Sequence, residues 1–410
     1  TLRNRLSFGP DAPPIDVLPL NVLIGPNGSG KSNILAALSL LQAAPGKLAA
    51  PTRGVGGGVS EWVWKGAAER TAMLEVVLDY RLNLLPLRHH IAFGDVNARF
   101  ELRDEFIEEA QKRDPRKDQP YFYYKYNGGS PLINAEKPKG EQSEPEDDQD
   151  AFADNGDKKY GLKRLPPVQV RTDESILSQR KDPELYPALA HLAAFYESIK
   201  IYNDWGFGRA CPLRATQAAD LPGEQLAEDY SNFALFLNHL DNDTQAGPAL
   251  RQSLKDVYQG VEDFGLRLES GAAQITLREK YVDRQVTFPA MRLSDGTLRY
   301  MCLVALLVDP QPPELLCIEE PELGLHPDLI PKIADLLVEA SKRTQVIVTT
   351  HSDILVDALS EHPEYVVVIE KHNGSTVTRR LENNEPLQSW LEKYRLGEVW
   401  ASGEIGGNRY

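Results

Sequence analysis

The sequence predicts an α/β protein with a mixed or parallel sheet, built from both ends of the chain around a large, mainly helical insert. Two observations predict this fold. Apolar strands and helices alternate before residue 95 and again after Met291, and a stretch of different composition separates them. A glycine-rich turn follows a strand near the N-terminus. The strands that end in polar residues lie near the C-terminus. Both ends must therefore fold onto one sheet.

Residues 1–95 form the first predicted part. An apolar run at Leu18–Ile24 predicts a strand, and Asn33–Ala44 predicts the helix that follows the glycine-rich turn. Alternating apolar and polar residues at Met73–Tyr80 and His89–Phe93 predict two more strands. We interpret this part as the beginning of a compact α/β lobe.

Residues 96–285 form the predicted insert, a lid or regulatory region. Helical patterns lie near Glu184–Glu197 and Glu224–Leu240, and strand-like runs near Phe264–Glu269 and Gln274–Glu279. No heptad pattern is sustained, so long coiled-coil arms are not expected.

The segment from about 134 to 159 lies inside this insert and is strongly polar. It is rich in Glu, Asp, Lys, Gly and Pro and contains few large apolar residues. Such a segment cannot bury enough surface to order itself, so we expect an acidic disordered loop.

Residues 286–382 complete the predicted lobe, and residues 383–410 are expected to form a C-terminal helix and tail. The predicted elements of the lobe are a helix at Leu298–Val308, a strand at Leu315–Glu319, a helix at Pro327–Ala340 and a strand at Gln345–Thr350.

The composition indicates a soluble globular chain. Of 410 residues, 41% are hydrophobic and 26% charged, and no apolar run reaches the roughly 20 residues that cross a bilayer. We therefore expect a cytoplasmic protein with no membrane part. The cysteines Cys211, Cys302 and Cys317 are widely scattered and are predicted to be small core residues.

The net charge of −15 argues against binding of nucleic acid by bulk electrostatics, which needs clustered lysine and arginine. A local basic stripe around Lys112–Lys117 stands among many carboxylates, which favours a solvated surface. Nucleic acid remains a possible partner that the charge does not indicate.

The glycine-rich turn carries the clearest chemistry. Residues Gly25-Pro26-Asn27-Gly28-Ser29-Gly30-Lys31-Ser32 match GxxxxGK[ST] between a strand and a helix. The backbone N–H groups of such a loop turn toward phosphate oxygens, and the helix N-terminus adds a positive dipole. We expect this loop and Asn33 to hold ATP, with Lys31 on the β and γ phosphates and Ser32 on Mg²⁺. A fortuitous turn is the alternative, which the register of strand, loop and helix disfavours.

Two adjacent carboxylates, Glu319 and Glu320, end a buried apolar strand. Successive strand side chains point opposite ways, so Glu319 can face Mg²⁺ while Glu320 orients an attacking water. A merely charged strand end is the alternative, and the phosphate loop favours catalysis.

His351 and Ser294 are two further candidates. His351 closes the next apolar strand, so it should emerge at the same sheet edge as Glu320 and sense the γ-phosphate, although a lone histidine is often structural. Ser294, Asp295 and Gly296 precede a helix and form a second anion-binding start, but taken alone they make an ordinary helix cap.

In this order GPNGSGKS, LSDGT, LLCIEEPE with LGLHP, and VTTHS resemble the Walker A, signature, Walker B with D-loop, and switch histidine of ABC-type ATPases. The sequence is most similar to the RecF/SMC-like, OLD-type branch, the AAA_15- and AAA_21-like predicted ATPases that often serve in defence systems. The resemblance covers about residues 2–92 and 290–380, and implies an ABC-type P-loop ATPase head that uses ATP and Mg²⁺. The ending from Tyr394 to Gly407 also looks family-like, without an assigned role.

The resemblance implies a homodimer, or a higher oligomer, in which two chains pack head to tail. Ser294, Asp295 and Gly296 of one chain would then contact the γ-phosphate held by Lys31 of the other. The signature reads SDG instead of SGG, Glu319 replaces the usual aspartate, and no Q-loop glutamine can be assigned, so slow hydrolysis is expected. About sixty residues follow His351, too few for the Toprim nuclease domain of OLD proteins.

The sequence is compared with three functions. The first is an ATPase that drives or gates a separate effector protein in anti-phage defence or DNA repair. The second is a nucleotide-gated scaffold, or a switch of a toxin-type complex, with little turnover and no direct action on DNA. The third, an ABC transporter subunit, is disfavoured because the insert and the EEPE-LGLHP segment resemble the SMC-like branch.

Overall fold

The computed structural model describes residues 1–53, 57–66, 70–79, 85–113, 115–116, 119–129, 131–136, 160–165, 171–206, 208, 211–258 and 260–407. The segment predicted to be a disordered loop belongs to a strand up to Glu136, and its residues 137–159 lie outside the described ones. Among the described helices, none has the length and apolar character needed to cross a membrane.

The chain divides into two compact units. We call the first the antiparallel unit, which comprises Thr1–Ile15, Asn33–Ser198 and Lys371–Val377, and the second the parallel unit. The parallel unit comprises Asp16–Ser32, Ile199–Glu370 and Thr378–Tyr410. Both units are therefore assembled from segments that are far apart in the sequence.

The antiparallel unit is built on a seven-stranded sheet. From edge to edge its strands are β1 (Leu2–Arg3), β3 (Thr71–Leu78), β4 (Leu87–Val96), β5 (Arg99–Glu109), β6 (Phe122–Asn127), β7 (Leu132–Glu136) and β8 (Tyr160–Arg164). Alternate residues of β5 are buried, as expected of a strand with one face on a core. The helices of this unit are most of α1 (Lys31–Ala43), then α2 (Val59–Trp62), α3 (Ile176–Gln179) and α4 (Pro187–Ser198).

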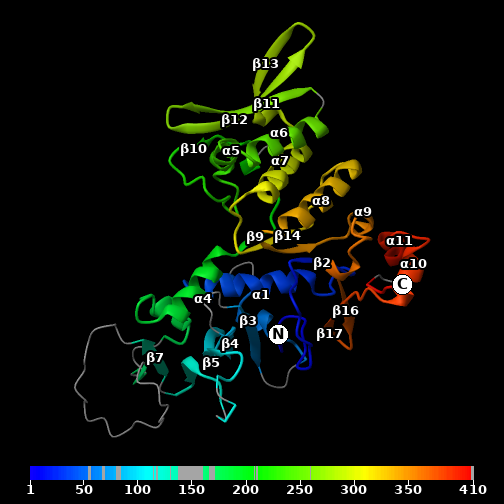
Figure 1. Cartoon of the computed structure of the whole chain (residues 1–410). Coiled ribbons are helices and arrows are strands. Elements are labelled where there is room, and N and C mark those ends of the chain that lie inside the picture. The colour runs from blue at the N-terminus through cyan, green and yellow to red at the C-terminus, as the bar shows by residue number, and fades with distance from the viewer. Residues whose placement is uncertain are drawn as a thin grey trace. The chain divides into compact units, whose positions relative to one another are not determined.

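The parallel unit is built on a six-stranded sheet, of which β17, β16, β2, β14 and β9 are labelled in Figure 1. Its strands are, in order, β17 (Ser375–Arg380), β16 (Val366–His372), β2 (Leu20–Ile24), β15 (Gln345–Thr349), β14 (Leu315–Glu319) and β9 (Lys200–Tyr202). From β16 to β9 the pairs are parallel, and β2 and β15 are buried almost throughout. These continuous apolar runs are typical of strands covered on both faces.

The parallel unit also contains helices and a smaller sheet. The helices are α5 (Phe233–Asp241), α6 (Ala246–Val257), α7 (Asp295–Val308), α8 (Ile330–Ala340), α9 (Asp353–Asp357), α10 (Glu385–Leu391) and α11 (Leu396–Ala401). The smaller sheet comprises β10 (Gln217–Ala218), β11 (Val261–Glu269), β12 (Ala272–Tyr281) and β13 (Arg284–Pro289). In Figure 1, α7 and α8 lie between the parallel sheet and this smaller sheet.

The structure corrects one part of the fold prediction, since the residues from 96 to 285 are not mainly helical. They contain β5 to β12 and only four α-helices among the described residues, and they contribute to both units. The strand β9 even joins the parallel sheet beside β14. Strand-like runs were predicted only within β11 and β12. The eleven-residue strand β5 was missed because it carries many charged residues, so that its period of two resembles a polar segment.

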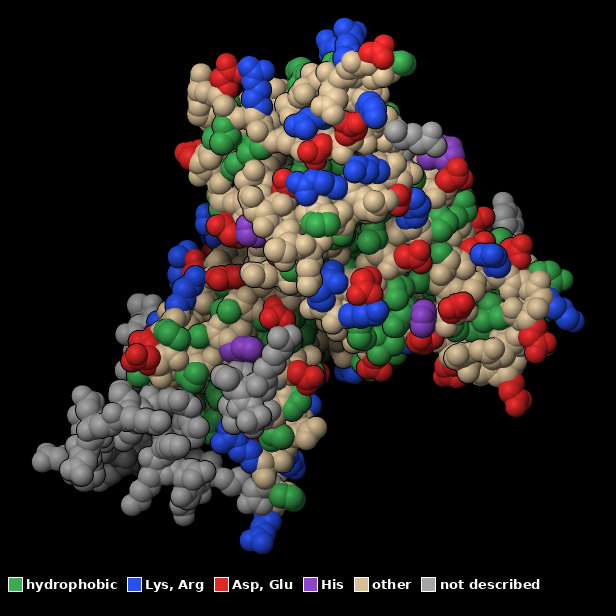
Figure 2. Space-filling view, turned by 45° about the horizontal axis from the view of Figure 1, so that its top comes forward, with side chains coloured by type: hydrophobic (Ala, Val, Ile, Leu, Met, Phe, Trp, Pro, Cys, Tyr) green, Lys and Arg blue, Asp and Glu red, His purple; other side chains and the backbone are tan. Residues whose placement is uncertain are grey.

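Two smaller predictions can be compared with the structure directly. The three cysteines are buried and free, as the sequence predicted. On the face shown in Figure 2, basic and acidic side chains are intermingled instead of gathering by sign. In the basic stretch near residue 112, Arg113 forms an ion pair with Glu109, and Lys117 lies outside the described residues.

Candidate nucleotide site

The phosphate loop leaves β2 and enters α1 within the parallel unit. Gly25, Gly28 and Gly30 have φ values of 150°, 79° and 119°, in the region that favours glycine. A Cβ on Gly25 would lie 2.1 Å from the carbonyl oxygen of Ile369 on β16, so this position also needs glycine for lack of space. The loop therefore has the backbone conformation that its glycines predicted.

Lys31 lies on the inside of this loop. Its Nζ donates to the carbonyl oxygens of Gly25 at 2.7 Å and Pro26 at 3.2 Å. Burial lowers the pKa of Lys31 to about 8, and the carboxylates of the nearby strand end, Glu320 first, partly oppose this by favouring the ammonium form. The residue is thus a buried cation held by carbonyl oxygens, which phosphate oxygens could replace.

Ser32 and Glu319 come together at the strand edge. The Ser32 Oγ donates to Oε1 of Glu319, the last residue of β14. A hydroxyl and a carboxylate oxygen are ligands that suit Mg²⁺, which usually takes few protein oxygens and completes its shell with water and phosphate. The two residues fit the predicted metal role, although no group of three or more potential metal ligands occurs among the described residues.

Glu320 follows directly and has an unusual backbone. Its φ is 47°, in the left-handed region, and its N–H donates to the Thr349 carbonyl oxygen at 2.9 Å. Its own carbonyl oxygen accepts from the buried Arg299, whose guanidinium lies 4.2 Å above the Trp205 ring. The carboxylate at this turn lies beside His351, which is a position suited to a group that orients water.

His351 lies beside Glu320, as predicted. The His351 Nε2 is 3.6 Å from Oε1 of Glu320, and both side chains are about one-third exposed, at 37% and 36%. The ends of β14 and β15 are adjacent because these strands are parallel neighbours. The structure thus brings Lys31, Ser32, Glu319, Glu320 and His351 to one edge of one sheet.

Sequence analysis missed one carboxylate of this edge, Glu322. Its Oε1 accepts from the Thr350 hydroxyl at 2.8 Å and from the His351 N–H at 2.9 Å, while its buried Oε2 has no hydrogen-bond partner among the described residues. Burial raises the pKa of Glu322. Glu322 therefore fixes the backbone at His351. Its position two residues after the carboxylate pair was the signal that could have identified it.

The predicted signature forms the start of α7. The Ser294 Oγ accepts from the Thr297 N–H at 3.0 Å, which is an N-cap, and the Ser294 side chain is exposed. Gly296 packs closely, because a Cβ there would lie 2.7 Å from the Gly324 carbonyl oxygen. No hydrogen bond joins Ser294 to Lys31 among the described residues, so within one chain the two predicted anion sites are separate.

Asp295 has a partner that the sequence did not reveal. Arg214 pairs with its carboxylate, with Nε to Oδ1 at 3.1 Å, and also donates to the Leu293 carbonyl oxygen. The Gly208 N–H donates to Oδ2 at 3.0 Å. These hydrogen bonds, that from Arg214 first, lower the pKa of Asp295. Arg214 therefore organises the loop before α7 and compensates the charge that SDG has in place of SGG.

The remaining residues of the predicted nucleotide site differ in their surroundings. Asn27 and Gly28 are exposed at the loop tip, and Ser29 is buried. Asn33 belongs to the antiparallel unit, where its Nδ2 donates to the Ser7 Oγ at 2.7 Å. The Asn33 side chain thus binds a residue outside the phosphate loop.

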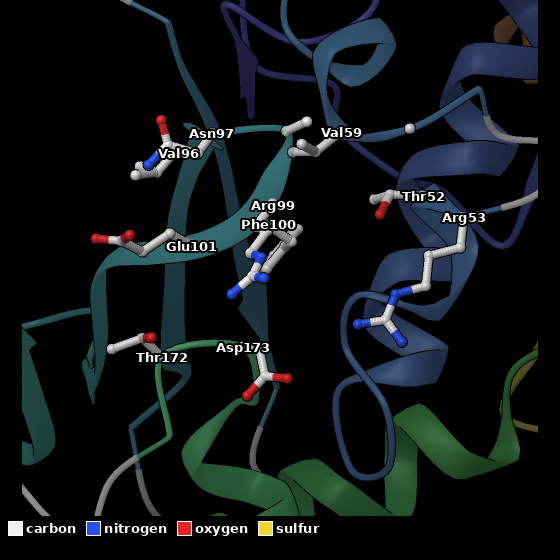
Figure 3. A pocket seen from close by; sticks show the side chains of 12 residues that line it. Thr52, Arg53, Val59, Val96, Asn97, Arg99, Phe100, Glu101, Thr172 and Asp173 are labelled. Carbon is white, nitrogen blue, oxygen red and sulfur yellow. The ribbon is translucent and has the colours of Figure 1, made fainter.

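A cavity of about 850 Å³ lies elsewhere, in the antiparallel unit. In Figure 3, Arg53 lies across it from Arg99, Glu101 and Asp173. None of the predicted site residues is among the residues that line it. Since charges of both signs face this space, it has no clear preference for an anionic ligand.

Solved structures of SMC heads resemble this chain. An SmcHead bound to the C-winged helix domain of ScpA matches with a TM-score of 0.53 and 14% identity, covering 94% of this chain and 98% of that one. The SMC head domain from Thermotoga maritima gives 0.38 and 16%, covering 93% and 97%. A Pyrococcus furiosus Smc head with an extended coiled coil, bound to the C-terminal domain of ScpA, gives 0.46 and 13%, covering 95% and 97%. The first likeness shows a shared fold.

Sequence comparison assigns the family. The curated proteins give no match. The family model described as "AAA domain, putative AbiEii toxin, Type IV TA system" matches residues 20–357, well over half of the chain. Because the matched residues run from the strand before the phosphate loop to the helix after His351, the chain belongs to this AAA_21 family and is an ATPase domain of the ABC/SMC-like type.

Proposed function

We propose that this protein binds and hydrolyses ATP with Mg²⁺ in a dimer of two copies, and that the nucleotide cycle drives or gates a separate effector protein. One observation carries the proposal. A buried lysine, a hydroxyl–carboxylate pair and a carboxylate–histidine pair meet at one sheet edge, next to a glycine loop that opens a helix. This is the set of groups that phosphoryl transfer to water requires.

Each group would have a distinct task. The loop N–H groups and Lys31 compensate the phosphate charge, while Ser32 and Glu319 hold the metal ion, which supplies Lewis-acid stabilisation of the γ-phosphate oxygens. Glu320 orients the attacking water and accepts its proton, and His351 donates a hydrogen bond to the γ-phosphate. Glu322 holds the backbone of His351 at its place.

A second copy would complete the site. Ser294 is exposed at the start of a fourteen-residue helix and, within the described part of the chain, makes no hydrogen bond to the phosphate loop. The Thr297 N–H caps onto the Ser294 Oγ, and the exposed start of the helix can face a phosphate held elsewhere. The C₂ dimer would bury two identical nucleotides, and higher oligomers could be built from it. The clamp of Arg214 on Asp295 supports this use, because it lowers the repulsion that a free carboxylate would exert on phosphate.

The biological setting is the second part of the proposal. The family description refers to a toxin–antitoxin system, and a structure with the same fold has a partner protein bound to its head. Both support a separate effector, in anti-phage defence or DNA repair, inside the cell. The alternative is a nucleotide-gated scaffold with little turnover. It is favoured by the departures at Asp295 and Glu319, which are expected to slow hydrolysis.

The variant Glu320→Gln tests the enzymatic part. The amide cannot accept the proton of the attacking water, so we expect turnover to fall by about 10² to 10⁴-fold while ATP binding persists. With ATP and Mg²⁺ the variant should elute as a long-lived dimer in size-exclusion chromatography, and EDTA should return it to monomer.

Glu314→Gln is a matched control, because Glu314 lies before the other end of the same strand, away from the loop. It should hydrolyse ATP like the wild type. Full turnover in Glu320→Gln would remove the assigned role, and a monomer in the presence of ATP would contradict the shared site. Turnover stimulated by DNA would favour the DNA-handling role over the scaffold.

A further inference from the structure

The C-terminal segment from Leu396 to Gly407 lies against the nucleotide site on two sides. Within the parallel unit this segment consists of α11 and a turn that ends with Gly406 and Gly407. Figure 1 shows α11 beside α9. One end of the segment meets the helix that follows His351, and the other meets the phosphate loop.

The turn at Gly407 reaches the first glycine of the phosphate loop. A Cβ on Gly407 would lie 3.7 Å from the Cα of Gly25 and 2.9 Å from Cγ1 of Val368. Both Gly406 and Gly407 have positive φ values, 73° and 76°, so the close approach depends on two consecutive glycines. The turn therefore packs directly on the backbone that holds Lys31.

Three hydrogen bonds hold this turn. The Gly407 N–H donates to Oε1 of Glu370 on β16 at 3.0 Å, and the Gly407 carbonyl oxygen accepts from Nε1 of the buried Trp400 at 3.2 Å. The Ile405 carbonyl oxygen accepts from Nη2 of Arg379 on β17 at 2.7 Å. The turn is thus fixed from three directions and is not a loosely packed end.

The other end of the segment is fixed to α9. The Gly397 N–H donates to Oδ1 of Asp357 at 2.7 Å, and the Leu396 N–H donates to the Ser360 Oγ at 2.9 Å. A Cβ on Gly397 would lie 2.2 Å from the Asp353 carbonyl oxygen, so α11 and α9 are in backbone contact. Since α9 begins two residues after His351, this end is joined to the γ-phosphate sensor.

We infer that residues 396–407 form a positioning element that fixes the phosphate loop at Gly25 and links it to the helix after His351. Gly25 is the residue whose carbonyl oxygen accepts from Lys31, so movement of the Gly407 turn would displace the lysine. The consequence for ATP affinity rests on the proposed function, whereas the mechanical link does not. The residues that act in this way are positioning residues, because none of them needs to touch the nucleotide. They are Glu370, Trp400, Gly406 and Gly407.

Hydrogen exchange of the nucleotide-free protein tests the link. Trp400→Phe keeps an aromatic ring at the buried position but removes the indole N–H and shortens the ring system, and Gly407→Ala introduces a Cβ at a positive φ. We expect both variants to raise exchange in the peptide covering Gly25–Lys31 and in the peptide covering α9, with unchanged exchange in β14. Trp390→Phe is the control, because Trp390 is 40% exposed on α10 and its ring lies tilted against that of Tyr394. It should change neither peptide.

The functional consequence is measured separately, as KM and kcat for ATP. One lost hydrogen bond behind the loop should raise KM about three- to tenfold and leave kcat within about twofold, since Glu320 and His351 keep their chemistry. Glu370→Gln, which retains an oxygen acceptor for the Gly407 N–H, should lose less than Glu370→Ala.

Several outcomes would overturn the inference. Wild-type exchange of the loop peptide in both Trp400→Phe and Gly407→Ala would do so, and a change confined to the loop would overturn the link to α9. Should Gly407→Ala and Trp400→Phe both lower the melting temperature strongly, the comparison of Glu370→Gln with Glu370→Ala still decides, because the glutamine retains an acceptor for the Gly407 N–H. If the wild type binds no ATP at all, the proposed function fails while the exchange result stands.

Discussion

The helices α1 and α7 both begin at a predicted anion-binding site, yet the two helix starts are built differently. At α1 the loop contains three glycines with positive φ and a buried lysine whose ammonium is held by carbonyl oxygens. At α7 a serine caps the helix, and the first helical residue is an aspartate neutralised by Arg214. The helix dipole is the same, but the charges that surround it are different.

This difference indicates which start can bind phosphate alone. The α1 loop supplies a full positive charge and an enclosing backbone, so under the proposed function it would hold a triphosphate within one chain. The α7 start supplies N–H groups and a hydroxyl but no net charge, which is enough to complete a site already occupied. The four predictions below test this division of labour, beginning with the largest effect.

Lys31→Ala should remove the charge that distinguishes the α1 start. We expect ATP affinity to fall by at least about a hundredfold, because several charge-assisted bonds to the β and γ phosphates are lost together. Isothermal titration with ATP and Mg²⁺ measures this. Lys47→Ala, at an exposed lysine after the same helix, should bind like the wild type. Unchanged affinity in Lys31→Ala would contradict the assignment of the loop.

The pH dependence of binding should follow the same lysine. Burial lowers the pKa of Lys31 to about 8, and phosphate oxygens favour its ammonium form, so binding above that pH requires proton uptake. The sign is therefore a loss of affinity as the pH rises, by about tenfold between pH 7 and pH 9. Titrations in buffers of different ionisation enthalpy would detect the proton. Lys31→Arg, which stays charged, should flatten the profile, and a flat wild-type profile would count against this account.

Mixing two inactive variants should reveal whether the α7 start acts on the other chain. Lys31→Ala and Ser294→Arg each spoil one half of every site in their own homodimers. In a mixed dimer one site has both defects, while the other joins the intact loop to the intact helix start. An equal mixture should therefore recover about a quarter of wild-type turnover, since half the dimers are mixed and half their sites work. Proven mixed dimers without turnover would mean that both sites must act together or that the helix start acts in its own chain.

The smallest effect is expected at Arg214. Arg214→Lys keeps the positive charge near Asp295 but loses the planar guanidinium that also reaches the Leu293 carbonyl oxygen. Turnover should fall about two- to threefold while the affinity of the α1 loop for ATP stays the same. If the affinity for ATP also fell, the helix starts of α1 and α7 would not be independent. Arg284→Lys, on the exposed strand β13, is the control substitution.

Sequence reasoning succeeded where the determinants are local. The loop glycines, Lys31, Ser32 and the carboxylate pair stand within single motifs, and the bounds of β14 were predicted without error. Parallel pairing of β14 and β15 then brought His351 to Glu320, as the motif order implied.

The failures concern contacts between distant segments. Arg214 lies 81 residues before Asp295, and no local pattern announces their pair. The strands β5 and β6 were missed because their polar faces hide the alternation. The role of Gly407 depends on a residue near the other end of the chain, Gly25. Such contacts are fixed by tertiary packing, which propensity and periodicity do not encode.

The left-handed backbone of Glu320 has a consequence for the evolution of this site. A non-glycine residue in that conformation costs on the order of 1 kcal/mol relative to glycine, so Glu320→Gly would relieve strain while deleting the group that orients water. A stabilising substitution is therefore available at the position where turnover would be lost. In a lineage that kept the fold but no longer needed hydrolysis, position 320 should be among the first to change. A carboxylate that persists at this position would indicate selection for turnover at the expense of stability.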